Sequence, residues 1–195
     1  MLSKNTFLCA LRFVIACSTL LVSNQSLAKQ DPQDTTIPSL CLKDESNLAT
    51  AWMGNAISTE SGYKNKKDGK IVSICTDVEQ APYQKVVYRY GLPQRIELEM
   101  IASDTAPFYF FNHSTSPHTG EDMVFFNNAN YTYYLVIAAG QANGVTLRIY
   151  HGKKLIFNRF SGNRDGEDFV LGPAEVDLKA RQSKRYQIKK PAHAF

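Results

Sequence analysis

The stretch that decides the fold is residues 131–158, YTYYLVIAAGQANGVTLRIYHGKKLIFN. It holds three runs rich in valine, isoleucine, leucine and tyrosine, which are residues that favour β-strands. In the middle run Val145, Leu147 and Ile149 take every second position, the period of a strand that buries one face. Glycine and asparagine clusters separate the runs, and such clusters are typical of hairpin turns. The stretch therefore predicts three neighbouring antiparallel strands.

Five further runs have the same composition and are also separated by turn residues. The eight predicted strands are Ile71–Cys75, Lys85–Tyr90, Arg95–Met100, Phe108–Phe111, Met123–Phe126, Tyr131–Ala138, Val145–Tyr150 and Lys154–Asn158. We expect them to form one all-β domain, a single antiparallel β-sandwich or barrel of about eight strands.

The same alternation assigns side chains to the two faces of two other strands. In Arg95–Met100 we expect Ile96 and every second residue after it to face the core, with the intervening glutamates in solvent. In Lys154–Asn158 we expect Leu155 and Phe157 to face the core.

The first 28 residues predict export. Lys4 and Arg12 give a positive start, Phe13–Val22 is apolar, and Ser26–Ala28 supplies the small residues of a cleavage site. The apolar run is shorter than the roughly 18 residues that a membrane-spanning helix needs. We therefore expect a signal peptide at 1–28, no transmembrane segment, and a periplasmic or secreted protein.

The remaining chain divides by composition into three parts. Residues 29–39 are polar with two prolines and predict a disordered leader. Residues 40–174 carry the predicted strands and form the β-domain. Residues 175–195 form a basic tail, which suits anionic lipids, cell-wall polymers or an acidic protein face, or is a solvated end. We expect no nucleic-acid partner, because the protein is exported.

Cysteine usage agrees with export. Cys41 and Cys75 are the two cysteines left after the predicted cleavage. An even pair in an oxidising compartment predicts a disulfide between them.

The sequence indicates no enzyme and no cofactor. It lacks the Gly-x-Ser-x-Gly, Ser-x-x-Lys and His-Glu-x-x-His patterns of hydrolases. Two segments carry possible metal ligands. His113, His118, Glu121 and Asp122 have ligand types that suit zinc or copper, with a polar hairpin tip as the alternative. Asn163–Asp168 offers oxygen atoms beside a glycine, as calcium loops do, with a plain turn as the alternative.

Aromatic residues suggest a role in binding. The chain has 22 of them, many in the strands between Phe108 and Tyr134. Alternation would turn about half outward, where tyrosine and phenylalanine serve protein or sugar recognition. The alternative is that both faces of these strands are buried, under a loop or in a homodimer.

Two motifs carry a resemblance to known families. Ile71–Cys75 and Tyr88–Glu99, followed later by Gly144–Thr146, resemble a loose group of exported bacterial β-proteins. Their shared pattern is a Val-Ser-x-Cys strand, then Tyr-Arg-Phe-Gly and Ile-Glu-Leu-Glu, and later Gly-Val-Thr. This resemblance implies an exported β-fold and no catalytic residue.

A second resemblance, at Ser61, Gly62, Tyr63 and Lys64, is to periplasmic lysozyme inhibitors. These are small exported β-proteins that insert a Ser-Gly-containing loop with a nearby tyrosine into a lysozyme cleft. The resemblance implies that these four residues bind a cell-wall hydrolase, so we expect a non-enzymatic inhibitor or immunity protein. The alternative is a structural, carbohydrate-binding or peptidoglycan-binding module of the cell envelope.

Overall fold

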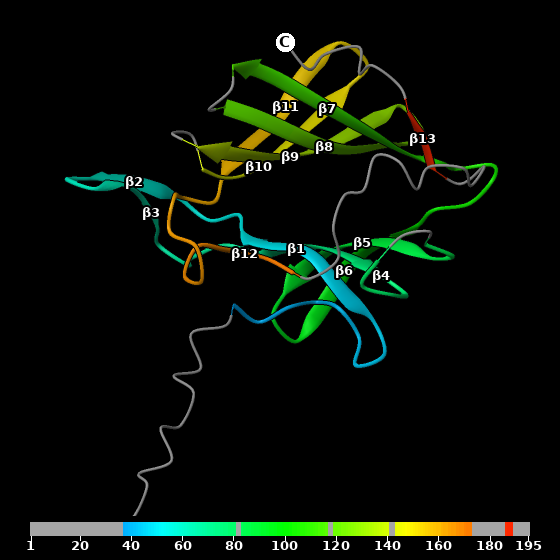
Figure 1. Ribbon diagram of the computed structural model, residues 1–195, viewed down its shortest axis with the longest axis horizontal. Coiled ribbons are helices and arrows are strands. Elements are labelled where there is room, and N and C mark those ends of the chain that lie inside the picture. The colour runs from blue at the N-terminus through cyan, green and yellow to red at the C-terminus, as the bar shows by residue number, and fades with distance from the viewer. Residues whose placement is uncertain (1–36, 81–82, 117–118, 141–142, 173–185, 189–195) are drawn as a thin grey trace, which may run out of the picture. The chain divides into compact units, whose positions relative to one another are not determined.

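The computed structural model describes residues 37–80, 83–116, 119–140, 143–172 and 186–188 (Figure 1). The predicted signal peptide, most of the leader and most of the basic tail lie outside these residues. Within them the protein is all-β, with no helix. Ile37, three residues before the predicted start of the domain, is buried in the hydrophobic core.

Two large sheets and one small one make up the fold, and neither large sheet is closed (Figure 1). The five-stranded sheet has the order β12 (Phe169–Leu171), β1 (Ser46–Trp52), β4 (Ile71–Thr76), β5 (Val86–Leu92) and β6 (Arg95–Ile101). The six-stranded sheet has the order β11 (Lys154–Phe160), β10 (Gly144–His151), β9 (Tyr131–Gly140), β8 (Thr119–Asn128), β7 (Phe108–Ser116) and β13 (Tyr186–Ile188). The small sheet is the hairpin of β2 (Ala56–Thr59) and β3 (Gly62–Asn65).

The predicted strands are all present, but the structure has more of them. Each of the eight predicted runs overlaps a strand, and their pairing is antiparallel as expected. The additional strands are β1, β2, β3, β12 and β13. β13 lies in the predicted basic tail and pairs with β7 in parallel, so the pairing is not antiparallel throughout.

One hydrophobic core contains side chains from both large sheets. Val72, Ile74 and Tyr88 of the five-stranded sheet belong to the same buried cluster as Phe126 and Leu147 of the six-stranded sheet. The ring centroids of Tyr88 and Phe126 are 4.9 Å apart. The prediction for Val145 and Leu147 is confirmed, because both are fully buried.

The six-stranded sheet buries side chains on its other face as well. Met123, Phe125, Tyr134 and Val136 form a second buried cluster. The residues next to them in sequence, such as Val124 and Leu135, belong to the main core and therefore lie on the opposite face. The strands between Phe108 and Tyr134 therefore bury rings on both faces. The expectation that half of these rings are exposed for recognition is wrong for the described residues, and the alternative with two buried faces holds.

Two predicted core residues are exposed, and a β-bulge explains each. Ile96 is 40 % exposed, because the β5–β6 register shifts between Tyr90 and Gly91. Leu155 is 43 % exposed, because the β10–β11 register shifts between Ile149 and Tyr150. A bulge adds a residue to one strand, so the side chains two positions apart on either side of it point to opposite faces of the sheet.

Candidate functional site

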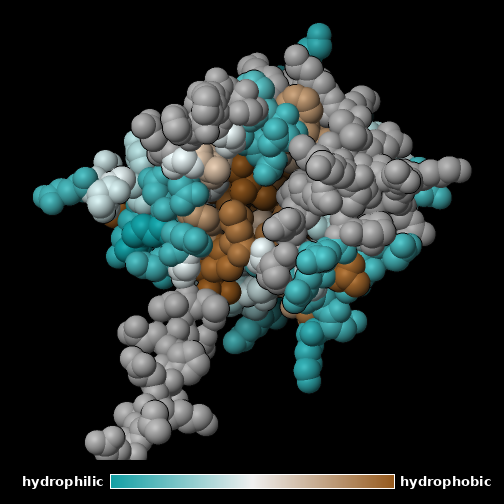
Figure 2. Space-filling model, viewed as in Figure 1, coloured by the Kyte–Doolittle hydropathy of each residue, from teal (hydrophilic) through white to brown (hydrophobic). Residues whose placement is uncertain are grey.

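The four residues predicted to bind a partner lie together on the β2–β3 hairpin, which we call the arm. Figure 1 shows the arm projecting away from the two large sheets. Figure 2 shows hydrophilic residues over the projecting end, with apolar residues gathered nearer the middle of the same face. Tyr63 is 50 % exposed, and Ser61 and Lys64 are also exposed. The predicted side chains are therefore exposed on one hairpin, with Tyr63 and Lys64 on its opposite faces, because neighbouring residues of a strand alternate.

Asn163 holds the start of β3 in place. Its Oδ1 accepts a hydrogen bond of 2.8 Å from the Tyr63 N–H, and its own N–H donates to the Tyr63 carbonyl at 2.9 Å. Its Nδ2 donates to the Asn143 carbonyl at 2.7 Å. Gly62 has a φ of 121°, and a Cβ atom there would lie 2.9 Å from Asn163 Oδ1. This position therefore requires glycine, and the clamp fixes the backbone that presents Tyr63.

Asp168 holds the other end of β3. Its side chain is fully buried, and its Oδ1 accepts a hydrogen bond of 3.0 Å from the Asn65 N–H. The Asn65 side chain donates to the Trp52 carbonyl at 3.2 Å, which links the arm to the five-stranded sheet. A Cβ atom on Gly162 would overlap the Asp168 carboxylate, so glycine allows this close approach. The loop that carries Asn163 and Asp168 is thus a structural clamp for the arm.

The arm and the loop that follows it carry an excess of positive charge. Lys64, Lys66 and Lys67 are all exposed, as is Glu60 at the turn of the hairpin, and residues 56–70 hold four lysines against two carboxylates. The nearby Asp68 carboxylate accepts hydrogen bonds from the backbone and side chain of Asn55, which lower its pKa. Lys67 has a φ of 58°, and its N–H donates to Asn65 Oδ1 at 2.8 Å. Lys64 therefore lies on β3 next to Tyr63 in sequence, and Lys66 and Lys67 lie on the turn that follows β3.

The predicted cysteine pair is confirmed. The sulfur atoms of Cys41 and Cys75 are 2.07 Å apart, which is a disulfide distance. The bond ties residues 37–45, which we call the strap, to β4. The strap lies on the face of the five-stranded sheet that carries Thr50, Ser73 and Arg89, because it hydrogen-bonds to all three.

Arg89 lies in a buried ionic network beneath the strap that the sequence analysis missed. The Arg89 side chain is 2 % exposed and contacts both Glu45 and Glu99, with Nη2–Oε1 and Nε–Oε2 distances of 3.0 and 2.7 Å. Lys85 also contacts Glu45, at 2.6 Å. Burial raises the pKa of Glu45, but hydrogen bonds from Arg89, Lys85 and the Leu42 N–H outweigh it and lower the pKa to about 2.

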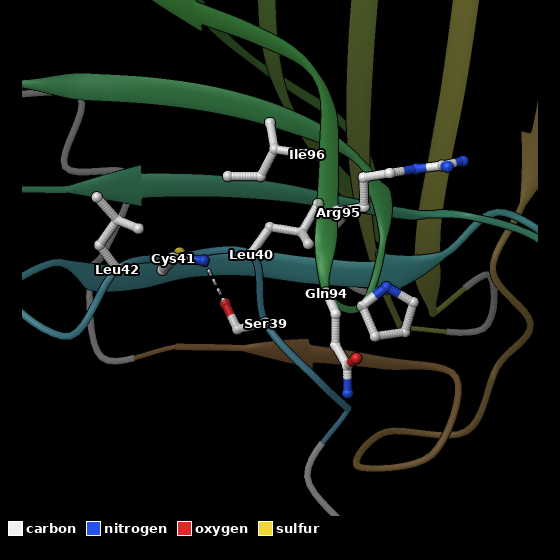
Figure 3. Close-up of a pocket in the computed structure, with 8 residues that line it drawn as sticks. Ser39, Leu40, Cys41, Leu42, Gln94, Arg95 and Ile96 are labelled. Atoms are coloured by element: carbon white, nitrogen blue, oxygen red, sulfur yellow. Dashed lines mark hydrogen bonds between the residues drawn. The ribbon is translucent and has the colours of Figure 1, made fainter.

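A pocket of about 270 Å³ opens between the strap and the β5–β6 turn. Its lining residues are Ser39, Leu40, Cys41, Leu42, Pro93, Gln94, Arg95 and Ile96. Figure 3 shows Leu40, Leu42 and Ile96 on one side of β6, with the Arg95 side chain extending to the other side. The pocket is therefore apolar on the strap side and holds no catalytic pair of groups.

The possible metal ligands do not form a site in the part of the chain that the structure describes. No group of three histidine, cysteine or carboxylate side chains lies close enough there to hold an ion. His113 and Glu121 are register partners on β7 and β8, and His118 lies outside the described residues. In the second candidate segment, Asn163–Asp168, the Asn163 and Asp168 side chains accept hydrogen bonds from the backbone amides of Tyr63 and Asn65. The segment is therefore a turn that holds the arm, which was the alternative to a calcium loop.

The described residues include no helix that is long and apolar enough to cross a membrane. Comparisons of the chain with protein-family models, curated proteins and solved structures give no match.

Proposed function

We propose that this chain is an exported, non-enzymatic binding protein that inhibits or neutralises a lysozyme-like cell-wall hydrolase. The observation that carries the proposal is the arm, a projecting hairpin that exposes Ser61, Tyr63 and Lys64 and is clamped at its base by Asn163 and Asp168. A clamped hairpin loses little conformational entropy on binding, so more of its contact energy becomes affinity.

The chemistry of the arm suits a hydrolase cleft. Glycosidases of this kind hold a pair of carboxyl groups on either side of the scissile bond. Lys64, Lys66 and Lys67 bring positive charge to such a cleft, and Tyr63 offers a large aromatic contact at low entropic cost. Both features agree with the resemblance of Ser61–Lys64 to the loop of periplasmic lysozyme inhibitors.

We also propose that the two large sheets form a β-sandwich in a periplasmic or secreted protein. Rings that meet across the sheets support the sandwich, namely Tyr88 with Phe126 and Tyr90 with Phe157. The Cys41–Cys75 disulfide supports an oxidising compartment.

Peptidoglycan lysis tests the proposal. Residues 29–195 are added in stoichiometric amount to a panel of lysozymes and amidases, and the decrease in turbidity is followed. We expect tight inhibition of at least one enzyme. Unchanged lysis rates across the panel would contradict a general inhibitor.

A second candidate function is a cell-envelope or peptidoglycan-binding module. Two cation–π pairs with partly exposed rings favour it. Lys70 Nζ lies 5.5 Å from the centroid of the Tyr90 ring, and the guanidinium carbon of Arg159 lies 5.4 Å from the centroid of the Phe157 ring. Co-sedimentation with insoluble peptidoglycan at low and high salt tests it. Salt-sensitive binding without enzyme inhibition would favour the module.

A further inference from the structure

β6 is an edge strand with an open side. Within the described residues it pairs with β5 on one side and has no strand on the other. It is seven residues long, and its side chains at Ile96 and Ile101 are exposed. A bulge between Ile96 and Leu98 bends this edge, and on either side of the bulge the strand presents unpaired backbone donors and acceptors to which an extended chain can add.

The charges on β6 do not block this edge. Edge strands commonly repel other strands with free charged side chains. On β6 the Glu99 carboxylate is paired with Arg89, and the Glu97 carboxylate is paired with Lys70 and Arg95. Both glutamates are therefore neutralised by cations of this chain.

The pocket between the strap and the β5–β6 turn lies at the start of this edge. Leu40, Leu42 and Ile96 give it an apolar wall, and Figure 3 shows these side chains on one side of β6. Its volume of about 270 Å³ is below the roughly 300 Å³ at which sites for drug-sized ligands begin, so it suits one large side chain. An edge strand with a neighbouring side-chain pocket is the arrangement by which peptides add to a sheet.

The other side of β6 has an excess of positive charge. Lys70 and Arg95 share the single carboxylate of Glu97, and the Arg95 side chain is 69 % exposed. Side chains of an added strand alternate between the two faces of the sheet. A residue next to the one in the pocket would therefore point toward these two cations, where an acidic side chain is favoured.

We propose that β6 is a docking edge for an extended peptide from a protein partner, with large apolar residues alternating with acidic ones. The peptide pairs with β6 as a sixth strand of the five-stranded sheet. One apolar side chain enters the pocket at Leu42 and Ile96, and an adjacent acidic side chain faces Lys70 and Arg95. This edge is separate from the arm, so the proposal does not depend on hydrolase inhibition.

Amide hydrogen exchange tests the docking edge. The probe is a seven-residue acetylated and amidated peptide in which leucine or valine alternates with glutamate, added in millimolar amount to isotope-labelled residues 29–195. We expect the outward-facing amides of β6 to exchange at least tenfold more slowly with the peptide bound. A peptide with lysine in place of glutamate should bind at least tenfold more weakly.

Matched variants at two edges locate the binding. Ile96→Asp and Leu42→Asp each charge the pocket and should raise the dissociation constant at least tenfold. Ile156→Asp makes the same change at an exposed position of β11, another edge strand, and should leave binding unchanged. Equal effects at Ile96 and Ile156, or no slowing of β6 exchange, would overturn the proposal. Slowing that needs no peptide and grows with protein concentration would show a second copy at this edge, and would also overturn it.

Discussion

Removal of the Glu45 carboxylate should destabilise the fold far more than removal of the Glu99 carboxylate. Both contact the same buried guanidinium of Arg89, but the Glu45 side chain is 1 % exposed and that of Glu99 is 42 % exposed. In Glu45→Ala, Arg89 keeps its charge but loses its buried partner, which costs about 3–5 kcal/mol. In Glu99→Ala, water can reach the freed donor, and the loss is about 1 kcal/mol or less.

Urea unfolding measures this difference. Trp52 is the one tryptophan of the chain and is 9 % exposed on β1, so its fluorescence reports loss of the core. The two variants should unfold with similar slopes and clearly different midpoints. Glu45→Gln keeps the shape of the side chain without its charge and should lie between Glu45→Ala and the wild type. Equal losses in Glu45→Ala and Glu99→Ala would refute the reasoning that burial sets the strength of this network.

Three further predictions concern the strap and the arm. The pKa of Glu45 in the folded protein is about 2, against an ordinary value of 4.5. The stability that the ionised Glu45 side chain contributes is therefore complete above pH 4.5 and is lost as the pH falls toward 2. Urea titrations over this range should show a loss of about 3 kcal/mol that Glu45→Gln lacks. Reduction of the Cys41–Cys75 bond, which spans 34 residues, should remove about 4 kcal/mol and lower the melting temperature by about 10 °C, whereas an unchanged melting temperature would contradict this. Asn163→Ala removes the acceptor of the Tyr63 amide and should speed its hydrogen exchange by about 5- to 30-fold, from about 1–2 kcal/mol of lost hydrogen bonding, with β4 amides as the unchanged control.

The local sequence predicts strands well where alternation matches burial. Val145 and Leu147 are buried as their spacing predicts, and the glycine and asparagine clusters mark the turns. Alternation fails at Ile96, because the bulge depends on a close approach of Gly91 to the Arg95 backbone. Such a contact forms between two strands and leaves no signature within either one.

Polar residues on the strap side hide one strand from the sequence. β1 contains the polar residues Asn47 and Thr50, which interrupt an apolar pattern. Thr50 can be buried because its hydroxyl group shares a hydrogen bond of 2.8 Å with Ser73 Oγ.

Arg89 is the residue whose sequence context could have revealed the buried ionic network. An arginine flanked by Val86–Tyr88 and Tyr90 on a buried strand requires acidic partners, although their identity depends on the fold.

The candidate site could be predicted only in part. Ser61–Lys64 is recognisable as an exposed segment from its glycine and lysines. Its two clamps were not foreseen, because Asn163 lies 100 residues from Tyr63 and Asp168 lies 103 residues from Asn65. The oxygen atoms of that loop resemble metal ligands in sequence, and the structure shows them accepting backbone hydrogen bonds.

The most direct test of the arm compares the wild type with the triple variant Ser61→Ala, Tyr63→Ala and Lys64→Ala in the peptidoglycan lysis assay. The wild type should inhibit at least one hydrolase of the panel. The variant should inhibit that enzyme at least tenfold more weakly with nearly the same melting temperature, because all three side chains are exposed. Equal inhibition by both proteins would contradict the assignment of the arm, and no inhibition by the wild type would contradict the proposed function.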